Sequence, residues 1–167
     1  MAKITLKNHP VNTIGNLPSV GTTAPSFSLV ASDLSEKTLE SFGNKRKIIY
    51  TVPSLDTPVC MQSTKHFSDK VSQASNVVVL VVSADLPFAQ GRICGSENIK
   101  NIHTLSMMRS KKFAEDYGVL IVDGPLQGLT ARAIIVLDED NKVVYTELVG
   151  EITHEPQYDQ ALAAALE

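Results

Sequence analysis

Ile48-Ile-Tyr-Thr-Val-Pro-Ser-Leu-Asp-Thr-Pro-Val-Cys60 carries the chain from a predicted strand into a predicted helix. The β-branched and aromatic run at 48–52 is typical of a buried strand, and Pro53 ends it. Apolar or small side chains then recur at every fourth position, which predicts a helix with one buried stripe at Val59, Ser63, Phe67 and Val71. The stretch therefore predicts the strand-to-helix junction of an α/β fold.

Cys60 lies at the start of this helix. If Thr57 caps the helix, Pro58 takes the first helical position, where its missing N–H is harmless, and Cys60 takes the third. Unpaired backbone N–H groups and the helix dipole favour an anion there, and the thiolate is the nucleophilic form of cysteine. A lone cysteine is usually a small buried hydrophobe, but this setting favours a catalyst. We expect the Thr57 hydroxyl either to cap the backbone or to bond the sulfur and a substrate, and Pro53 to shield the site from water.

The rest of the chain alternates strand and helix signals. The continuous apolar run at Asn76–Ser83 is the strongest strand signal and is typical of a sheet covered on both faces. By contrast, Asp85–Asn101 is interrupted by proline and glycine and is expected to be irregular. The other expected elements are strands at Lys3–Leu6 and Phe27–Val30, a short helix or turn at Leu34–Phe42, a helix at Ser110–Gly118, paired strands at Ala133–Leu137 and Val143–Val149, and a closing helix with a stripe of Tyr158, Leu162 and Leu166.

Length and composition favour one α/β domain over residues 1–167, since the chain shows no repeat and no linker. The net charge of −3 gives no general reason to expect nucleic acid or an anionic membrane as a partner. The N-terminus lacks the apolar segment of a signal peptide, and the longest apolar run is too short to span a bilayer. Two cysteines in such a chain predict the reducing cytoplasm, where thiols are more often catalytic or redox-sensing than structural.

Pro53, Thr57 and Cys60 form the pattern Pro-x-x-x-Thr-x-x-Cys, which resembles the active-site signature of peroxiredoxins. Further motifs are similar to those of bacterial thiol peroxidase, the atypical two-cysteine peroxiredoxins: Ser83–Gln90, Arg92-x-Cys94-Gly95, Asp116–Gly118, Asp123–Pro125 and Ala131–Ala133. The similarity runs over nearly the whole chain. One departure is Pro58, because related sequences commonly carry glycine there, and proline stiffens the helix start.

The resemblance implies a thioredoxin-like fold, with a central mixed sheet flanked by helices and an N-terminal β-hairpin. It also implies an antioxidant enzyme that reduces hydrogen peroxide and organic hydroperoxides, prefers the organic ones and forms a homodimer. Cys60 matches the peroxidatic cysteine, which becomes a sulfenic acid. Cys94 matches the resolving cysteine, which condenses with that sulfenic acid into an intramolecular disulfide. Thioredoxin would then reduce the disulfide by thiol exchange.

Two more residues gain expected roles from the resemblance. Arg132 matches the arginine that family members place beside the peroxidatic sulfur, where a permanent charge favours the thiolate and holds peroxide oxygens. By position alone, a surface ion pair is the alternative for Arg132. Phe88 is expected either to line a pocket for an alkyl substrate or, equally, to pack in the core. We also expect disulfide formation to need local unwinding around Cys60, because bridged cysteines need Cα atoms within about 7 Å.

Two other functions stay open. One is thiol–disulfide exchange without peroxide chemistry, although no Cys-x-x-Cys motif is present. The other is a redox sensor in which a disulfide between Cys60 and Cys94 switches a surface. His66 lies six residues beyond Cys60 and is expected to face solvent rather than to activate the thiol. Neither a zinc site nor a cofactor is expected, since no ligand spacing links the cysteines with His9, His66, His103 and His154.

Overall fold

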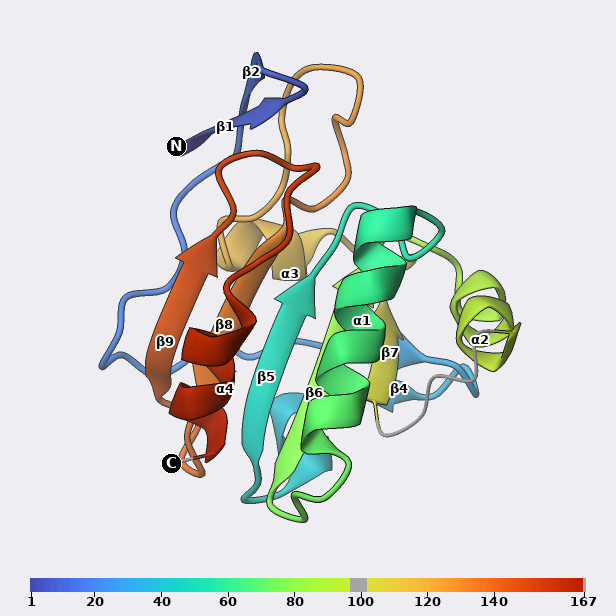
Figure 1. Ribbon diagram of the computed structural model, residues 1–167, viewed down its shortest axis with the longest axis vertical. Coiled ribbons are helices and arrows are strands. Elements are labelled where there is room, and N and C mark those ends of the chain that lie inside the picture. Colours follow the sequence, from blue (N-terminus) through green and yellow to red (C-terminus); the bar gives the residue numbers. More distant parts are fainter. Residues whose placement is uncertain (97–101, 167) are drawn as a thin grey trace.

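The computed structural model describes residues 1–96 and 102–166 (Figure 1). These residues form a two-stranded sheet and a seven-stranded sheet with the strand order β4-β3-β7-β6-β5-β8-β9. The strands are β1 (Lys3–Leu6), β2 (His9–Asn12), β3 (Leu29–Ala31), β4 (Glu36–Lys37), β5 (Arg46–Thr51), β6 (Val77–Ser83), β7 (Ile102–Ser106), β8 (Ala133–Leu137) and β9 (Val143–Leu148). The helices are α1 (Pro58–Val71), α2 (Pro87–Ser96), α3 (Lys112–Asp116) and α4 (Tyr158–Leu166), with a 3-10 helix, η1 (Leu39–Phe42).

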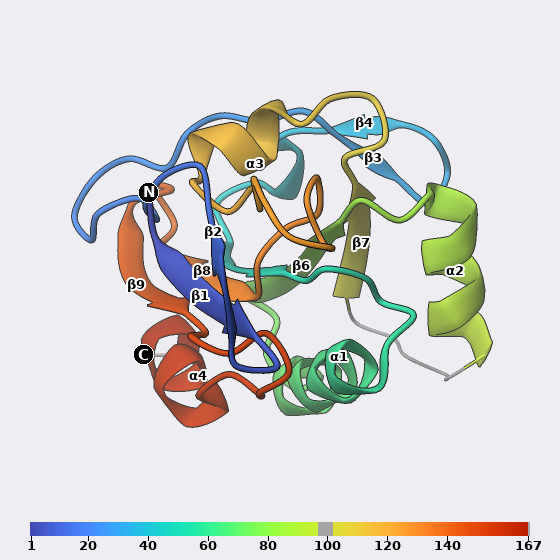
Figure 2. The same ribbon diagram turned by 90° about the horizontal axis from the view of Figure 1, so that it is seen from above.

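The large sheet separates two layers of helices. Figure 2 shows α1 and α4 on one face, α3 on the other, and α2 to one side, beyond β7. The β5–β6 and β6–β7 pairs are parallel, whereas the other neighbouring strands of this sheet pair antiparallel. The expected α/β fold with a central mixed sheet flanked by helices is therefore confirmed.

Strand β6 lies in the middle of the sheet, and all seven of its residues are buried. Both of its neighbours run parallel to it. Because helices and loops cover both faces at this position, side chains on either side of the strand need to be apolar, and the sequence Val-Val-Val-Leu-Val-Val-Ser meets this need. Each buried valine or leucine contributes roughly 1.5–3 kcal/mol relative to an exposed one. The predicted strand at 76–83 is confirmed, as are those at 48–52, 133–137 and 143–149.

The prediction of an irregular segment at Asp85–Asn101 is wrong where the chain is described, because Pro87–Ser96 forms helix α2. Proline suits the first position of a helix, since its missing N–H has no partner there anyway. Burial of Pro87, Gln90 and Ile93 holds this helix against the rest of the protein. Packing therefore outweighs the low helix propensity of the two glycines. Residues 97–101 of the predicted segment lie outside the described residues.

Helix α4 is present, but its buried stripe differs from the prediction. Ala161, Leu162 and Ala165 are buried, whereas Leu166 is 49% exposed. Small alanine side chains let the helix backbone approach the sheet closely, so the face that carries Ala161 and Ala165 is the one that packs. The leucine at the end of the predicted stripe is left outside this contact.

The β1–β2 hairpin, seen in Figure 1, confirms the expected N-terminal hairpin. Side chains join it to two loops that are distant in the sequence. Asp123 accepts hydrogen bonds from the backbone N–H and the Nδ2 of Asn12, at 2.7 and 2.6 Å. Glu151 accepts bonds from the Asn8 N–H at 2.8 Å and the Thr5 hydroxyl at 2.9 Å. Hydrogen bonds hold the pKa of Glu151 far below its usual range. The bond from the Asn8 N–H has the largest effect, and those from Thr153 and Thr5 add to it. The hairpin is thus tied to the body by two ionised carboxylates.

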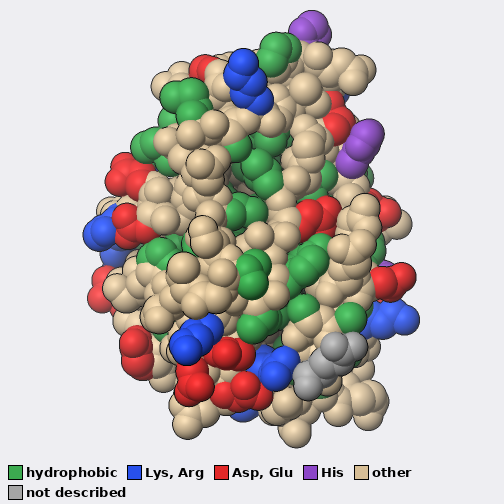
Figure 3. All heavy atoms as spheres, turned by 90° about the vertical axis from the view of Figure 1, so that its left-hand side faces the viewer, with side chains coloured by type: hydrophobic (Ala, Val, Ile, Leu, Met, Phe, Trp, Pro, Cys, Tyr) green, Lys and Arg blue, Asp and Glu red, His purple; other side chains and the backbone are tan. Residues whose placement is uncertain are grey.

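The surface carries charges of both signs. On the face shown in Figure 3, acidic and basic side chains lie close together near the lower end. Within the described residues, no helix has the length and apolar composition needed to cross a bilayer. The same residues contain no group of three or more His, Cys, Asp or Glu side chains placed to hold a metal ion.

The segments at 34–42 and 110–118 both shorten relative to the prediction. The first divides into β4 and η1, and the second becomes α3, which ends two residues before Gly118.

Gly118 has a φ of +70°, a conformation that glycine adopts without strain. A Cβ atom at this position would overlap the backbone of Asn16, so both the dihedral angle and the available space require glycine.

The substitution Gly118→Ala should therefore lower the free energy of unfolding by more than about 2 kcal/mol, because the clash is with backbone that has no rotamer to change. Gly150→Ala is the matched control, since a Cβ atom there meets nothing within 4 Å. Urea unfolding followed by circular dichroism measures both. Equal stability of the two variants would contradict this account of Gly118.

Candidate active site at the edge of the sheet

Three chain segments meet at one edge of the large sheet. Strands β5 and β6 are adjacent and parallel, so their carboxyl ends lie at the same edge. Strand β8 is antiparallel to β5, and its first residue, Ala133, pairs with Thr51, the last residue of β5. The residues that follow β5, follow β6 and precede β8 are therefore neighbours. These segments carry Cys60, Asp85 and Arg132, respectively.

Cys60 is the third residue of α1, as the sequence predicts, and its side chain is fully buried. Thr57 directly precedes the helix, but its hydroxyl donates to the carbonyl oxygen of Ser54 at 3.0 Å. Among the described residues, Thr57 makes neither the expected capping bond nor a bond to the sulfur. Its hydroxyl instead tightens the loop that leads into α1.

Arg132 lies beside the sulfur. Its Nη1 donates to Cys60 Sγ at 3.0 Å, and its Nε donates to the carbonyl oxygen of Ile152 at 2.9 Å. The residue is only 2% exposed, so the alternative of a surface ion pair is excluded. Burial alone would lower the pKa of Arg132, but attraction to Tyr50 and Cys60 and hydrogen bonds to both raise it. The guanidinium therefore stays charged next to the thiol.

Tyr50 is a member of the site that the sequence analysis missed. Its hydroxyl oxygen accepts a hydrogen bond from Arg132 Nη1 at 3.0 Å, the same nitrogen that donates to Cys60. Burial raises the pKa of Tyr50 well above its usual range, although Arg132 opposes the shift, so the phenol stays neutral. The available signal was the alternation of β5: Tyr50 shares a face with Ile48, opposite Ile49, and that face packs on α1.

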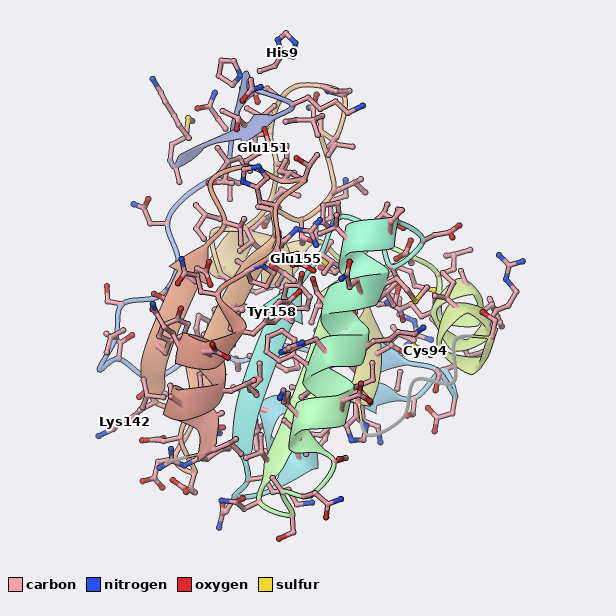
Figure 4. The ribbon with its side chains drawn as sticks, viewed as in Figure 1. His9, Cys94, Lys142, Glu151, Glu155 and Tyr158 are labelled. Atoms are coloured by element: carbon pink, nitrogen blue, oxygen red, sulfur yellow. The ribbon has the colours of Figure 1, made fainter. Side chains whose placement is uncertain are left out.

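Tyr158 joins the closing helix to α1 on the same face of the sheet. Figure 4 shows its ring at the start of α4, directed toward α1. Its hydroxyl donates to Ser63 Oγ at 2.8 Å, and its ring packs against Phe67 with centroids 5.4 Å apart. His66 stacks on Tyr158 with ring centroids 4.1 Å apart, so the prediction that His66 simply faces solvent is wrong. The aromatic ring of Tyr158, at the start of α4, therefore draws the imidazole against the protein.

Asp85 is a second residue whose role the sequence analysis missed, although it lies within a motif quoted for the resemblance. One carboxylate oxygen accepts a hydrogen bond from Ser54 Oγ at 2.7 Å. The other accepts bonds from the Leu55 N–H at 2.8 Å and from Ser83 Oγ at 2.7 Å. The carboxylate therefore holds the loop between β5 and α1 from the end of the neighbouring strand, which positions Cys60.

Cys94 lies on α2, at the side of the molecule (Figure 4). Both cysteines are free thiols, and Cys94 is partly exposed while packing against the apolar cluster that contains Cys60. Burial raises the pKa of the Cys94 thiol. A cavity of about 250 Å³ adjoins this thiol, with Lys37 and His103 among its lining residues. The resolving partner implied by the resemblance therefore lies on a different helix from Cys60, and the two thiols form no disulfide in this structure.

The remaining two predicted site residues differ in their burial. Pro53 is buried just after β5, and its role in shielding the site from water stays a prediction. Phe88 lies on α2 and is 67% exposed, so the prediction that it packs in the core is wrong. A helix with one narrow buried face leaves this position outside the core.

Comparison with known proteins places this arrangement in context. A family model described as Redoxin matches residues 19–162. A curated thiol peroxidase from Leptospira interrogans is 50% identical over 167 residues, which cover 99% of this chain and 98% of the relative. The sequence likeness therefore extends over both proteins almost completely.

Solved structures give the same result. A peroxiredoxin-like protein from Aquifex aeolicus is 44% identical, with a TM-score of 0.91 over 98% of this chain and 96% of that one. A thiol peroxidase from Chromobacterium violaceum is 28% identical, with a TM-score of 0.90 over 96% of this chain and 93% of that one. The fold of these relatives is therefore the fold of this chain.

The contact between Tyr50 and Arg132 yields a test. Tyr50→Phe should slow alkylation of Cys60 by iodoacetamide about tenfold at neutral pH, because Nη1 loses one of the two acceptors that orient it. Tyr117→Phe is the control, since it also removes one hydroxyl bond from a buried ring, at 2.8 Å to the Pro25 carbonyl, on the other face of the sheet. Peptide mapping by mass spectrometry resolves the two thiols. Equal rates in both variants would exclude a positioning role for Tyr50.

Proposed function

The chain belongs to the Redoxin family, and from this premise we propose a catalytic cycle in which Cys60 reduces a hydroperoxide, Cys94 forms a disulfide with it and thioredoxin restores both thiols. At a coarser level, the protein is a peroxidase of the oxidoreductase class that carries out thiol-dependent peroxide reduction. The observation that carries the proposal is the 3.0 Å hydrogen bond from Arg132 to the Cys60 sulfur, between two buried groups. A permanent cation beside a cysteine sulfur favours the thiolate, which is the nucleophilic form.

The first step uses the groups at the edge of the sheet. The Cys60 thiolate attacks the terminal oxygen of the hydroperoxide, an S–O bond forms and the O–O bond breaks. The leaving oxygen takes a proton and departs as water or an alcohol, while Cys60 becomes a sulfenic acid. Arg132 stabilises the negative charge that moves from sulfur to the leaving oxygen, because its guanidinium is already fixed by Tyr50 and the Ile152 carbonyl.

The second step joins the two cysteines. The Cys94 thiolate attacks the sulfur of the sulfenic acid, the S–O bond breaks and the oxygen leaves as water. Because Cys60 is fully buried in α1 and Cys94 lies on α2, we propose that the first turn of α1 unwinds for this step. Pro58 at the first helical position stiffens that turn, so it bears directly on how readily the turn opens.

The third step needs an external thiol. Thiol exchange with thioredoxin reduces the disulfide, and partly exposed Cys94 is the sulfur that an incoming thiolate reaches more easily than Cys60. A cycle of this kind operates where thiol reductants are kept reduced, so we propose a cytoplasmic location. The homodimer and the preference for organic hydroperoxides stay predictions.

The exposed Phe88 on α2 is a proposed contact for the alkyl part of an organic substrate. Its 67% exposure leaves the ring free to cover an apolar group.

Cysteine variants separate this cycle from thiol exchange and from redox sensing. Cys60→Ser should abolish rapid consumption of hydrogen peroxide and of cumene hydroperoxide. Cys94→Ser should still consume one equivalent but stall as the sulfenic acid, which dimedone traps for mass spectrometry. Normal turnover of Cys94→Ser with thioredoxin would exclude its resolving role, and slow reaction of the wild-type protein at the rate of free cysteine would favour a sensor or an exchange enzyme.

The raised pKa of Cys94 predicts how the second step depends on pH. Because the attacking species is the thiolate, and burial keeps Cys94 protonated, the rate of disulfide formation should rise about tenfold per pH unit between about pH 6 and pH 8. Single-turnover experiments, quenched with acid and read by intact mass, measure this rate. A rate that levels off below about pH 8 would contradict the assignment of Cys94 as the attacking thiol.

A further inference from the structure

The Cys60 loop, which connects β5 to α1 and so positions Cys60, is joined to the helix that carries Cys94 by three side chains. Asp85 holds the loop through Ser54 Oγ at 2.7 Å and the Leu55 N–H at 2.8 Å. Ser83 donates to the Asp85 carboxylate at 2.7 Å. Gln90, on α2, donates from Nε2 to Ser83 Oγ at 3.0 Å. A continuous chain of hydrogen bonds therefore runs from the loop to α2.

The end of this chain lies close to Cys94. Gln90 and Cys94 are four residues apart on α2, so they share one side of the helix. Gln90 is fully buried, and its Nε2 also donates to the Leu105 carbonyl on β7 at 3.0 Å. The side chain therefore fixes the turn of α2 that precedes Cys94.

Few side chains of helix α2 are buried. Its buried residues are Pro87, Gln90 and Ile93, and a Cβ atom at either Gly91 or Gly95 would meet nothing within 4 Å. Gln90 Oε1 is buried and has no hydrogen-bond partner among the described residues. An unsatisfied buried acceptor regains a partner when it reaches water, so displacement of α2 is opposed by the two bonds of Gln90 Nε2 together with the burial of Pro87 and Ile93.

We propose that Asp85, Ser83 and Gln90 form a latch that keeps the Cys60 loop and α2 in the arrangement that reacts with peroxide. The latch opens before Cys94 attacks the sulfenic acid of Cys60, forming the S–S bond and releasing water. This inference rests on the proposed disulfide cycle. It assigns the residues separate positioning roles: Asp85 favours the first step by holding the loop, and Gln90, through Ser83, restrains the second step by holding α2.

Two substitutions test the latch at its two ends. Asp85→Asn weakens the hold on the loop. Sulfenic acid formation should therefore slow about fivefold, and disulfide formation should accelerate about fivefold. Each change corresponds to the loss of one ordinary hydrogen bond. Gln90→Met keeps the side-chain length but removes the bond to Ser83, so it should accelerate disulfide formation and leave the peroxide step unchanged. Because Gln90→Met preserves the contacts of Asp85 with the loop, this variant tests whether the latch restrains disulfide formation even if Asp85→Asn fails to fold.

The measurement is a rapid acid quench after one equivalent of hydrogen peroxide, with sulfenic acid and disulfide quantified by intact mass, because the chain contains no tryptophan to report by fluorescence. Asp123→Asn is the matched control, since Asp123 also holds a loop through a backbone N–H and a side chain, at the hairpin of Asn12. It should lower stability without changing either step.

Three outcomes are distinguishable. Faster disulfide formation in Gln90→Met, with Asp123→Asn unchanged, supports the latch. Disulfide formation that is no faster than wild type in the folded variants overturns the latch and leaves the proposed cycle intact. A wild-type protein that reacts with peroxide but forms no disulfide overturns the cycle, and the latch with it.

Discussion

A buried guanidinium is the constraint on which the rest of this structure depends. Arg132 is 2% exposed, and an isolated buried charge costs several kcal/mol unless other groups compensate it. Its acceptors are the Ile152 carbonyl, the Tyr50 hydroxyl and the Cys60 sulfur, and no carboxylate of the described residues pairs with it. Of these three acceptors, a cysteine sulfur is the group that takes a negative charge most readily. Stability and reactivity therefore depend on the same contact.

The mixed sheet brings Arg132 and Cys60 into contact. Antiparallel pairing of β8 with β5 puts Arg132 beside the end of the strand that leads to Cys60. Two threonine hydroxyls reinforce the pairing, from Thr51 to the Ala131 carbonyl at 2.8 Å and from Thr130 to the Val52 carbonyl at 2.6 Å. Because these bonds fix Thr130 and Ala131, the two residues that precede Arg132, the guanidinium has little freedom to leave the sulfur.

The sequence predicted what local patterns encode and missed what pairing between distant segments creates. The strand at 76–83 and the helix start at Cys60 follow from apolar runs and the proline spacing, and Arg132 was identified through a family resemblance. Nothing local shows that Asp85 reaches the loop at Ser54, because that contact exists only once β5 and β6 are parallel neighbours. Helix α2 was missed for the same reason, since its burial and not its glycine-rich composition makes it a helix.

In the proposed cycle, oxidation of Cys60 would change the balance of these forces. Cys60 is fully buried, so a sulfenic acid must place one more oxygen atom in a closely packed site, and overpacking of this kind typically costs about 1–3 kcal/mol. A protonated sulfenic acid also no longer balances the charge of Arg132, which weakens the contact that held the first turn of α1. Both effects arise only after the peroxide step and favour opening of the site. In the proposed cycle, the packing that surrounds the Cys60 sulfur therefore becomes, once oxygen is transferred, a force that favours its exposure to Cys94.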